Sequence, residues 1–185
     1  MAIDGCTPLH EATSSNGGFE VIKLLLENSS NPEAVDEENN TPLHNAAEKG
    51  SLNIVRVLIE HSNDVTTYVN ATNQNKETAL HCAVKMGHSE VAEYLLENNC
   101  KVSEVDTEKD TELHYAAANG NSCISTLLLN YSVDVKAYTN AHNSKKETAL
   151  HLAARKGRFE VAKLLLENHS DIGAVDKHQN TILHC

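Results

Sequence analysis

The fold is decided by a stretch that reads TALHLAARKGRFEVAKLLLEN and runs from Thr148 to Asn168. Its first four residues, which are threonine, any residue, leucine and histidine, occur six times in the 185-residue chain, beginning at Thr7, Thr41, Thr78, Thr111, Thr148 and Thr181. These starts lie 34, 37, 33, 37 and 33 residues apart. Self-similarity at such a period indicates a chain built from stacked copies of one small structural unit.

Each tetrapeptide has the chemistry of a helix start. Threonine is a good N-cap, because its hydroxyl accepts a hydrogen bond from an otherwise unpaired N–H of the first turn. Pro8 and Pro42 follow it in two copies, and proline is favoured at the first position of a helix. The histidine stands three residues after the threonine, where its ring can hydrogen-bond near the helix start. We therefore expect a short Ala-rich helix after each motif, and then a second helix, such as Glu160 to Asn168.

This pattern resembles the ankyrin repeat family, in which each unit opens with Thr-Pro-Leu-His-x-Ala-Ala. The resemblance covers essentially the whole chain and implies an all-α fold with short β-hairpin fingers, an ankyrin-repeat solenoid of stacked helix-turn-helix units. It implies a single domain with units at 7–40, 41–77, 78–110, 111–147 and 148–180 and a partial sixth at 181–185. Because the sixth copy stops just past its Thr-Ile-Leu-His, we expect the chain to be a fragment of a longer array.

The second and fourth units are four residues longer than the 33-residue unit. The extra residues fall after the second helix, in Asp64–Ala71 and Asp134–Ala141. Both segments contain β-branched and aromatic residues, so we expect longer β-hairpin fingers there. Residues 41–110 and 111–180 are identical at 32 of 70 positions, which indicates duplication of a two-unit block.

Two local features of the sequence indicate that parts of individual units are less rigid than the rest. The turn at Ser14–Gly18 in the first unit has one extra residue and one extra glycine, so we expect it to be looser. The second helix of the fourth unit begins Ser122-Cys123-Ile124-Ser125-Thr126, and serine and threonine are poor formers of a helix interior. We expect this to be the softest internal unit.

Composition argues against several classes of partner. The formal net charge is −11, whereas nucleic acid and anionic membranes attract basic surfaces, so neither is expected as a partner. No apolar run approaches 18 residues, so no membrane insertion is expected. Residues 1–110 hold 7 basic and 19 acidic residues, and residues 111–185 hold 8 and 7. The acidic first two-thirds either suits a basic protein or peptide partner or is simply a solvated surface, and nothing in the sequence indicates an oligomeric state.

No group of residues indicates catalysis, a metal site or a cofactor. The chain has no phosphate loop, nucleophile elbow or His-Glu-x-x-His, and the motif histidines recur once per unit at a structural position. The five cysteines are irregularly spaced without Cys-x-x-Cys, which indicates neither a disulfide framework nor a zinc site. Reduced thiols fit a cytoplasmic or nuclear protein. Cys82 falls where other units have Leu152 or Tyr115, so we expect it to be a packing residue.

The resemblance implies that the chain is a non-catalytic protein-interaction module. Ankyrin arrays bind through a concave face made of finger tips and outward positions of the first helices. Carried over by position, the candidate contacts are Glu37, Glu38, Asn40, Glu48 and Lys49 in the second unit, Gln74, Asn75, Glu77, Lys85 and Met86 in the third, Thr107, Glu108, Asp110, Ala118 and Asn119 in the fourth, and Ser144, Lys145, Glu147, Arg155 and Lys156 in the fifth. The alternative is a structural spacer or spring, or an adaptor segment, of a larger channel, scaffold or effector protein.

A methionine, two tyrosines and a basic cluster are stronger candidates than the other positions. Met86 is large, apolar and adaptable at a position that is usually exposed. Tyr68 and Tyr138 occupy equivalent points of the two longer fingers, and tyrosine is a favoured interface anchor. The alternative for each tyrosine is that it packs on its own finger or on the neighbouring one. A second candidate patch, for an acidic peptide, is the basic cluster Lys145, Lys146, Arg155, Lys156 and Arg158, which is otherwise a solvated helix face.

Overall fold

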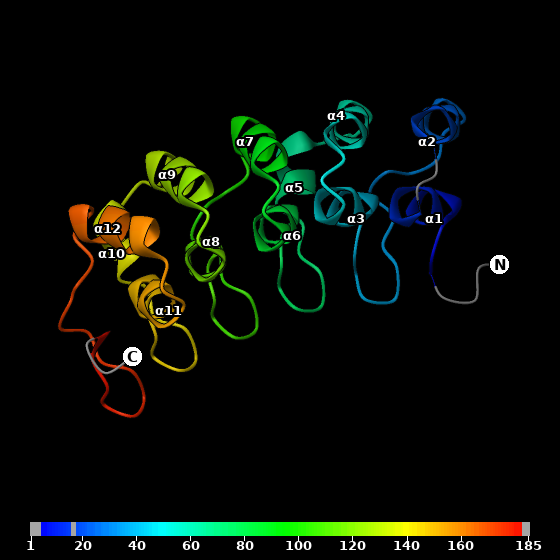
Figure 1. The fold of residues 1–185 in the computed structure, drawn as a ribbon. Helices are drawn as coiled ribbons and strands as arrows, with labels where there is room; N and C mark the ends of the chain where they lie inside the picture. Colours follow the sequence, from blue (N-terminus) through cyan, green and yellow to red (C-terminus); the bar gives the residue numbers. More distant parts are fainter. Residues whose placement is uncertain (1–4, 16–17, 183–185) are drawn as a thin grey trace. The chain divides into compact units, whose positions relative to one another are not determined.

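Twelve α-helices provide almost all the regular structure of residues 5–15 and 18–182, the residues that this computed structural model describes. They are drawn in Figure 1 and run Pro8–Ser14 (α1), Phe19–Glu27 (α2), Pro42–Glu48 (α3), Leu52–Glu60 (α4), Val65–Val69 (α5), Ala79–Met86 (α6), Ser89–Glu97 (α7), Glu112–Asn119 (α8), Ser122–Tyr131 (α9), Val135–Thr139 (α10), Ala149–Arg155 (α11) and Phe159–Glu167 (α12). The turn between α1 and α2, for which we expected a looser conformation, includes residues 16–17, which lie outside the described residues.

The chain divides into two compact units, one ending at Lys101 and the other beginning at Val102. In the first unit, α3 packs between α1 and α6, and α4 packs between α2 and α7, so the first and second helices of the pairs form two layers (Figure 1). In the second unit, α8 packs on α11 and α9 packs on α12. The predicted stacking of helix-turn-helix pairs is therefore present within each unit.

Leucine and alanine form most of the core of each unit. Leu43, Leu58, Leu80 and Leu95 are fully buried in the first unit, and Leu113, Leu128, Leu150 and Leu165 are fully buried in the second. Each fully buried leucine contributes about 1.5–3 kcal/mol of hydrophobic stabilisation. Alanines such as Ala46, Ala47 and Ala83 are equally buried, and their small side chains allow the paired helices to lie close together.

The predicted helix starts are confirmed in the part of the chain that the structure describes. Thr7, Thr41, Thr78, Thr111 and Thr148 each form a capping box with the histidine three residues later. At Thr41, for example, the backbone N–H donates to His44 Nδ1 over 3.1 Å, and Thr41 Oγ1 lies 2.9 Å from the same nitrogen. The sixth motif includes His184, which lies outside the described residues.

Three of the motif histidines also connect one repeat to the next. Because Nδ1 accepts a backbone N–H, the proton of the neutral ring is on Nε2. His10, His44 and His114 donate from Nε2 to main-chain oxygens of the following finger, over distances of 2.9, 3.0 and 3.1 Å to Asn40, Glu77 and Glu147, respectively. Burial lowers the pKa of His44 and of His114, which favours the neutral ring that this bridge requires. The structural interpretation of these histidines is thus confirmed.

The prediction of longer β-hairpins in the second and fourth units is wrong. The extra residues form the short helices α5 and α10 instead. The Asp64 side chain accepts from Thr67 N over 3.2 Å, and Asp134 accepts from Ala137 N over 2.9 Å, so each aspartate is a helix N-cap. The β propensity of valine and threonine depends strongly on context, and here the cap and the burial of one helix face prevail. Within the described residues, the only β pairing is an isolated antiparallel bridge between Val175 and Thr181.

Candidate interaction surface

Five fingers of equal length connect the repeats, and each is a tight turn held by its first side chain. They span Asp36–Asn40, Asn73–Glu77, Asp106–Asp110, Asn143–Glu147 and Asp176–Asn180, and in each the first N–H donates to the fifth carbonyl oxygen. In the first finger, Asp36 Oδ1 accepts from the N–H groups of Glu38 and Asn40 over 2.9 and 2.8 Å. Because an Asp or Asn side chain closes every turn in this way, the tips are fixed before any partner binds.

Neighbouring fingers are also hydrogen-bonded to one another inside each unit. Gln74 N donates to Glu38 O over 2.8 Å in the first unit, and Ser144 N donates to Glu108 O over 2.8 Å in the second. Side chains add to this, because the Asn73 amide donates to Asn40 Oδ1 over 3.0 Å and the Asn143 amide donates to Asp110 Oδ1 over 2.9 Å. Asn40 and Asp110, named as candidate contacts, therefore also serve to hold the row of fingers together.

A groove of about 180 Å³ in the first unit brings together many of the predicted contacts. It lies beside the packed helices α3 and α6 and two fingers, and its lining includes seven of the candidates, namely Glu38, Asn40, Glu48, Asn75, Glu77, Lys85 and Met86. Met86 is 56% exposed, as expected for this position of the repeat. Asn45 is not among the predicted contacts, yet it also lines the groove and donates to Ser14 Oγ over 2.8 Å. It occupies the position directly after a motif histidine, which varies between units, and Cys82 at the same position of the next unit lines the same groove.

The remaining candidates outside this groove are mostly exposed. In the first unit these are Glu37, Lys49 and Gln74, and in the second unit they are Thr107, Glu108, Asn119, Ser144, Lys145, Arg155 and Lys156. Ala118 is half-buried. The basic cluster of the second unit is exposed at all five of its residues, although Arg158 Nε donates to Ala118 O over 3.1 Å and Arg155 is ion-paired.

Glu77 and Glu147 were named as contacts, but both are buried, and each forms an ion pair. Glu77 contacts the Lys85 ammonium, and Glu147 contacts the Arg155 guanidinium. Burial alone would raise the pKa of Glu77, but the hydrogen bonds from Lys85 and Asn73 outweigh it and hold the pKa below its ordinary value. The pKa of Glu147 is lowered in the same way by Arg155 and Asn143 against the effect of burial. These two carboxylates are therefore charged anchors within the array, although Glu77 also lines the groove.

The expectation that Tyr68 and Tyr138 are exposed anchors is also wrong. Their side chains are 3% and 2% exposed, respectively. The Tyr68 hydroxyl donates to Pro32 O over 2.8 Å, and the Tyr138 hydroxyl donates to Glu112 Oε2 over 3.0 Å. Burial raises the pKa of both phenols, so they remain neutral. The alternative, in which each tyrosine packs inside the array, describes them correctly.

Two other buried groups have strongly shifted pKa values. Burial raises the pKa of the Cys82 thiol to about 12, so this side chain stays a neutral thiol and packs as predicted. Burial also raises the pKa of the Glu112 carboxyl to about 8. Ser103 N donates to Glu112 Oε2 over 3.2 Å, beside the Tyr138 hydroxyl. Glu112 is not among the predicted site residues, and it occupies the position that Pro42 and Ala149 have in other units.

A family model described as ankyrin repeats in three copies matches the chain at residues 2–69, 65–139 and 113–185. The chain belongs to the ankyrin repeat family. The predicted family and fold class are thereby confirmed. Ankyrin repeats generally mediate protein–protein interaction and are typically non-catalytic. Among the described residues of this ankyrin-repeat chain, no helix is both long and apolar enough to cross a bilayer.

Several known proteins are similar to this ankyrin-repeat chain over part of their length. The E3 ubiquitin-protein ligase XBAT33 of Arabidopsis thaliana is 36% identical over 136 residues, which cover 69% of this chain and 25% of that protein. The human transient receptor potential cation channel subfamily A member 1 is 35% identical over 117 residues, which cover 63% of this chain and 10% of the channel. The putative ankyrin repeat protein FPV014 of fowlpox virus is 32% identical over 127 residues, covering 68% of this chain and 28% of that protein. The chain thus matches less than a third of the length of each relative.

Proposed function

We propose that this ankyrin-repeat chain is a non-catalytic protein-interaction module that binds its partner through the groove beside α3 and α6 and the adjoining finger tips. The observation that carries the proposal is Met86, a large apolar side chain that is 56% exposed beside a groove lined by Glu38 and Glu48. The fingers are already ordered by their own hydrogen bonds, so binding there costs little conformational entropy.

The charges of this groove favour a basic protein or peptide partner. Lys85 is paired with Glu77, so its charge is largely compensated. Glu38 and Glu48 are exposed, and Glu37 lies next to Glu38 on the same finger. A lysine or arginine beside an apolar side chain would complement both the carboxylates and Met86. We expect such a partner in the cytoplasm or nucleus, and expect neither nucleic acid nor membrane to bind this surface.

A pull-down from a cell extract tests this proposal. The test variant carries Met86→Ala, Glu38→Gln and Glu48→Gln, and the matched control carries Leu24→Ala, Glu60→Gln and Glu97→Gln on the second helices, where all three residues are exposed. We expect the wild type and the control to retain one partner that the test variant loses, with equal melting temperatures for all three. Equal recovery of that partner by the test variant would place the binding site elsewhere.

The second candidate is a spacer or adaptor segment of a larger protein. Its support is the similarity to a cation channel of which the chain matches only a tenth, and to an E3 ubiquitin-protein ligase of which it matches a quarter. In that case the groove would carry no binding energy, and the test variant and the wild type would recover the same proteins.

A further inference from the structure

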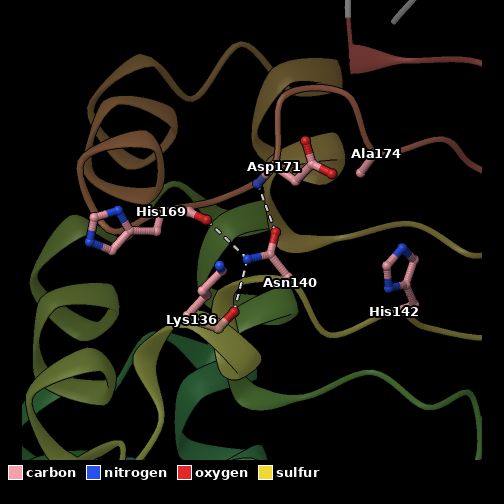
Figure 2. Close-up of a pocket in the computed structure, with 6 residues that line it drawn as sticks. All are labelled: Lys136, Asn140, His142, His169, Asp171 and Ala174. Carbon is pink, nitrogen blue, oxygen red and sulfur yellow. Dashed lines mark hydrogen bonds between the residues drawn. The ribbon is translucent and has the colours of Figure 1, made fainter.

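A second cavity, of about 620 Å³, lies in the second unit away from the candidate contacts. It is lined by Lys136, Asn140, His142, His169, Asp171 and Ala174, which come from α10, from the segment that follows it and from the loop after α12 (Figure 2). This volume is within the range of about 300–1,000 Å³ that is usual for ligand sites. None of the lining residues is among the candidate contacts of the concave face, so the proposed binding groove does not explain this cavity.

Asn140, at the centre of the cavity, has a structural role that needs no ligand. The Asn140 amide nitrogen donates to Lys136 O over 2.8 Å and to His169 O over 3.0 Å, while Asp171 N donates to Asn140 Oδ1 over 2.7 Å (Figure 2). Asn70 makes the same three bonds in the first unit, to Thr66 O, Asn99 O and Lys101 N, over 2.8, 3.1 and 2.8 Å. This asparagine ties the short helix to the following loop in both copies of the duplicated block, and it is no evidence for a ligand.

The side chains around that asparagine differ between the copies, and the second copy has two more histidines and a lysine at a different place. Thr66, Thr72 and Asn99 of the first copy are replaced by Lys136, His142 and His169 in the second, while Lys101 is replaced by Asp171 and Glu104 by Ala174. Since the same hydrogen bonds form with either set, the fold does not require the basic residues. Among residues 5–15 and 18–182, no hydrogen bond or ion pair engages the Lys136 ammonium or either imidazole ring. The Asp171 carboxylate, by contrast, is held in its own turn, where Oδ1 accepts from Gly173 N over 2.8 Å.

The arrangement of the basic groups indicates what size of ligand they suit. Figure 2 shows the Lys136 and His169 side chains on one side of Asn140 and the His142 ring on the other. A single small anion would meet only one side. We infer that this cavity binds a peptide segment that carries at least two anionic groups, carboxylates or phosphates, one on each side of Asn140. The site would give the protein a second partner surface, and it does not depend on the groove beside α3.

The test exploits the duplication, because residues of the first copy are known to fit the same scaffold. The variant Lys136→Thr, His142→Thr, His169→Asn gives three positions of the cavity lining the residues of the first copy and leaves Asp171 and Ala174 in place. Its control, His61→Thr, Lys163→Thr, His178→Asn, removes one lysine and two histidines from other exposed positions. Three labelled peptides serve as probes in fluorescence anisotropy: one with consecutive glutamates, one with two phosphoserines separated by a glycine, and an uncharged peptide of equal length. Inorganic phosphate serves as the competitor.

We expect the wild type and the control to bind at least one anionic peptide, the cavity variant to bind it at least about tenfold more weakly, and the uncharged peptide not to bind. Asp171→Asn should tighten binding, because it removes the one opposing charge in the lining. Preference for the glutamate or the phosphoserine peptide identifies the source of the anionic groups. Equal affinity of the wild type and the cavity variant, or an equal loss in the control, would overturn the inference, since only general electrostatic attraction would remain. An inhibition constant for phosphate equal to the Kd of the anionic peptide would also overturn it, because one small anion would then account for the full binding energy.

Discussion

The Tyr138 hydroxyl donates to Glu112 Oε2 over 3.0 Å, and both side chains are buried in the second unit. In the first unit the equivalent Tyr68 donates to a main-chain oxygen, that of Pro32, over 2.8 Å. The duplicated block has thus kept the tyrosine and exchanged a neutral acceptor for a carboxyl group. A fully buried carboxyl is costly to ionise, so this exchange introduces at the tyrosine of the second unit a pH dependence that the Pro32 oxygen does not give at Tyr68.

The substitution Glu112→Gln should remove the loss of folding stability that ionisation of Glu112 causes near neutral pH. Burial raises the pKa of Glu112 from an ordinary value near 4.5 to about 8, so between these values the folded state holds a proton that the unfolded state has released. The free energy of unfolding then falls as the pH rises through that window, by up to about 1.4 kcal/mol per pH unit. The difference in unfolding free energy between the Glu112→Gln variant and the wild type, measured in urea, should therefore grow from pH 5 to pH 8. A difference that is constant with pH would show that Glu112 ionises normally.

The sequence predicts a structural feature best when the residues that produce it lie close together in the chain. The helix starts follow from a threonine and a histidine three residues apart, and both partners of each cap lie in one short segment, as at Thr41 and His44. The helix that follows Asp64 is harder to predict, because its valines and threonines have β propensity and only the capping potential of this aspartate indicates a helix start.

The burial of the candidate side chains was less predictable. Tyr68 is buried by its contact with Pro32, which lies 36 residues away in the preceding repeat. Glu77 turns inward because Lys85, on the following helix, and Asn73 satisfy its charge. Contacts of this kind depend on the packing of neighbouring repeats, which the period alone does not describe. Positions that face solvent, such as Glu48 and Met86, were predicted correctly because the repeat leaves nothing to cover them.

His44→Asn should destabilise the protein and also flatten its response to acid. The substitution removes the ring bonds to Thr41 and to Glu77 O, at a cost of about 2 kcal/mol. Burial lowers the pKa of His44 below 6.5, so the unfolded state binds the proton first as the pH falls through 6.5. The free energy of unfolding must then decrease on acidification through this range. Urea denaturation of the Glu112→Gln variant at pH 5.5 to 7.5, with and without His44→Asn, isolates this slope from that of Glu112. His178→Asn, at an exposed position, should leave it unchanged.

Lys85→Met should cost more stability than the exposure of Lys85 suggests. The Lys85 side chain is 38% exposed, but that of its partner Glu77 is only 10% exposed, so the substitution leaves a carboxylate with poor solvation. We expect a loss of about 1–3 kcal/mol at pH 7. Because the pKa of Glu77 is lowered in the folded protein, the contribution of the pair is present above about pH 4.5 and is lost as the pH falls below it. The double variant Lys85→Met, Glu77→Gln should recover most of the loss in thermal unfolding. No recovery would mean that Lys85 acts through packing of its aliphatic chain.

Helix α9 should be the softest of the internal second helices. Ile124 and Leu128 are fully buried, which holds the helix in place, but Ser122, Cys123 and Thr126 are exposed and favour the helical state less than alanine. Hydrogen exchange measured by NMR should therefore be faster at residues 122–129 than at α7, its counterpart in the preceding repeat. Thr126→Ala and Cys123→Ala touch no buried contact and should slow exchange across the helix. If residues 122–129 are instead the best protected of the chain, packing outweighs helix propensity here, and the two substitutions should then change nothing.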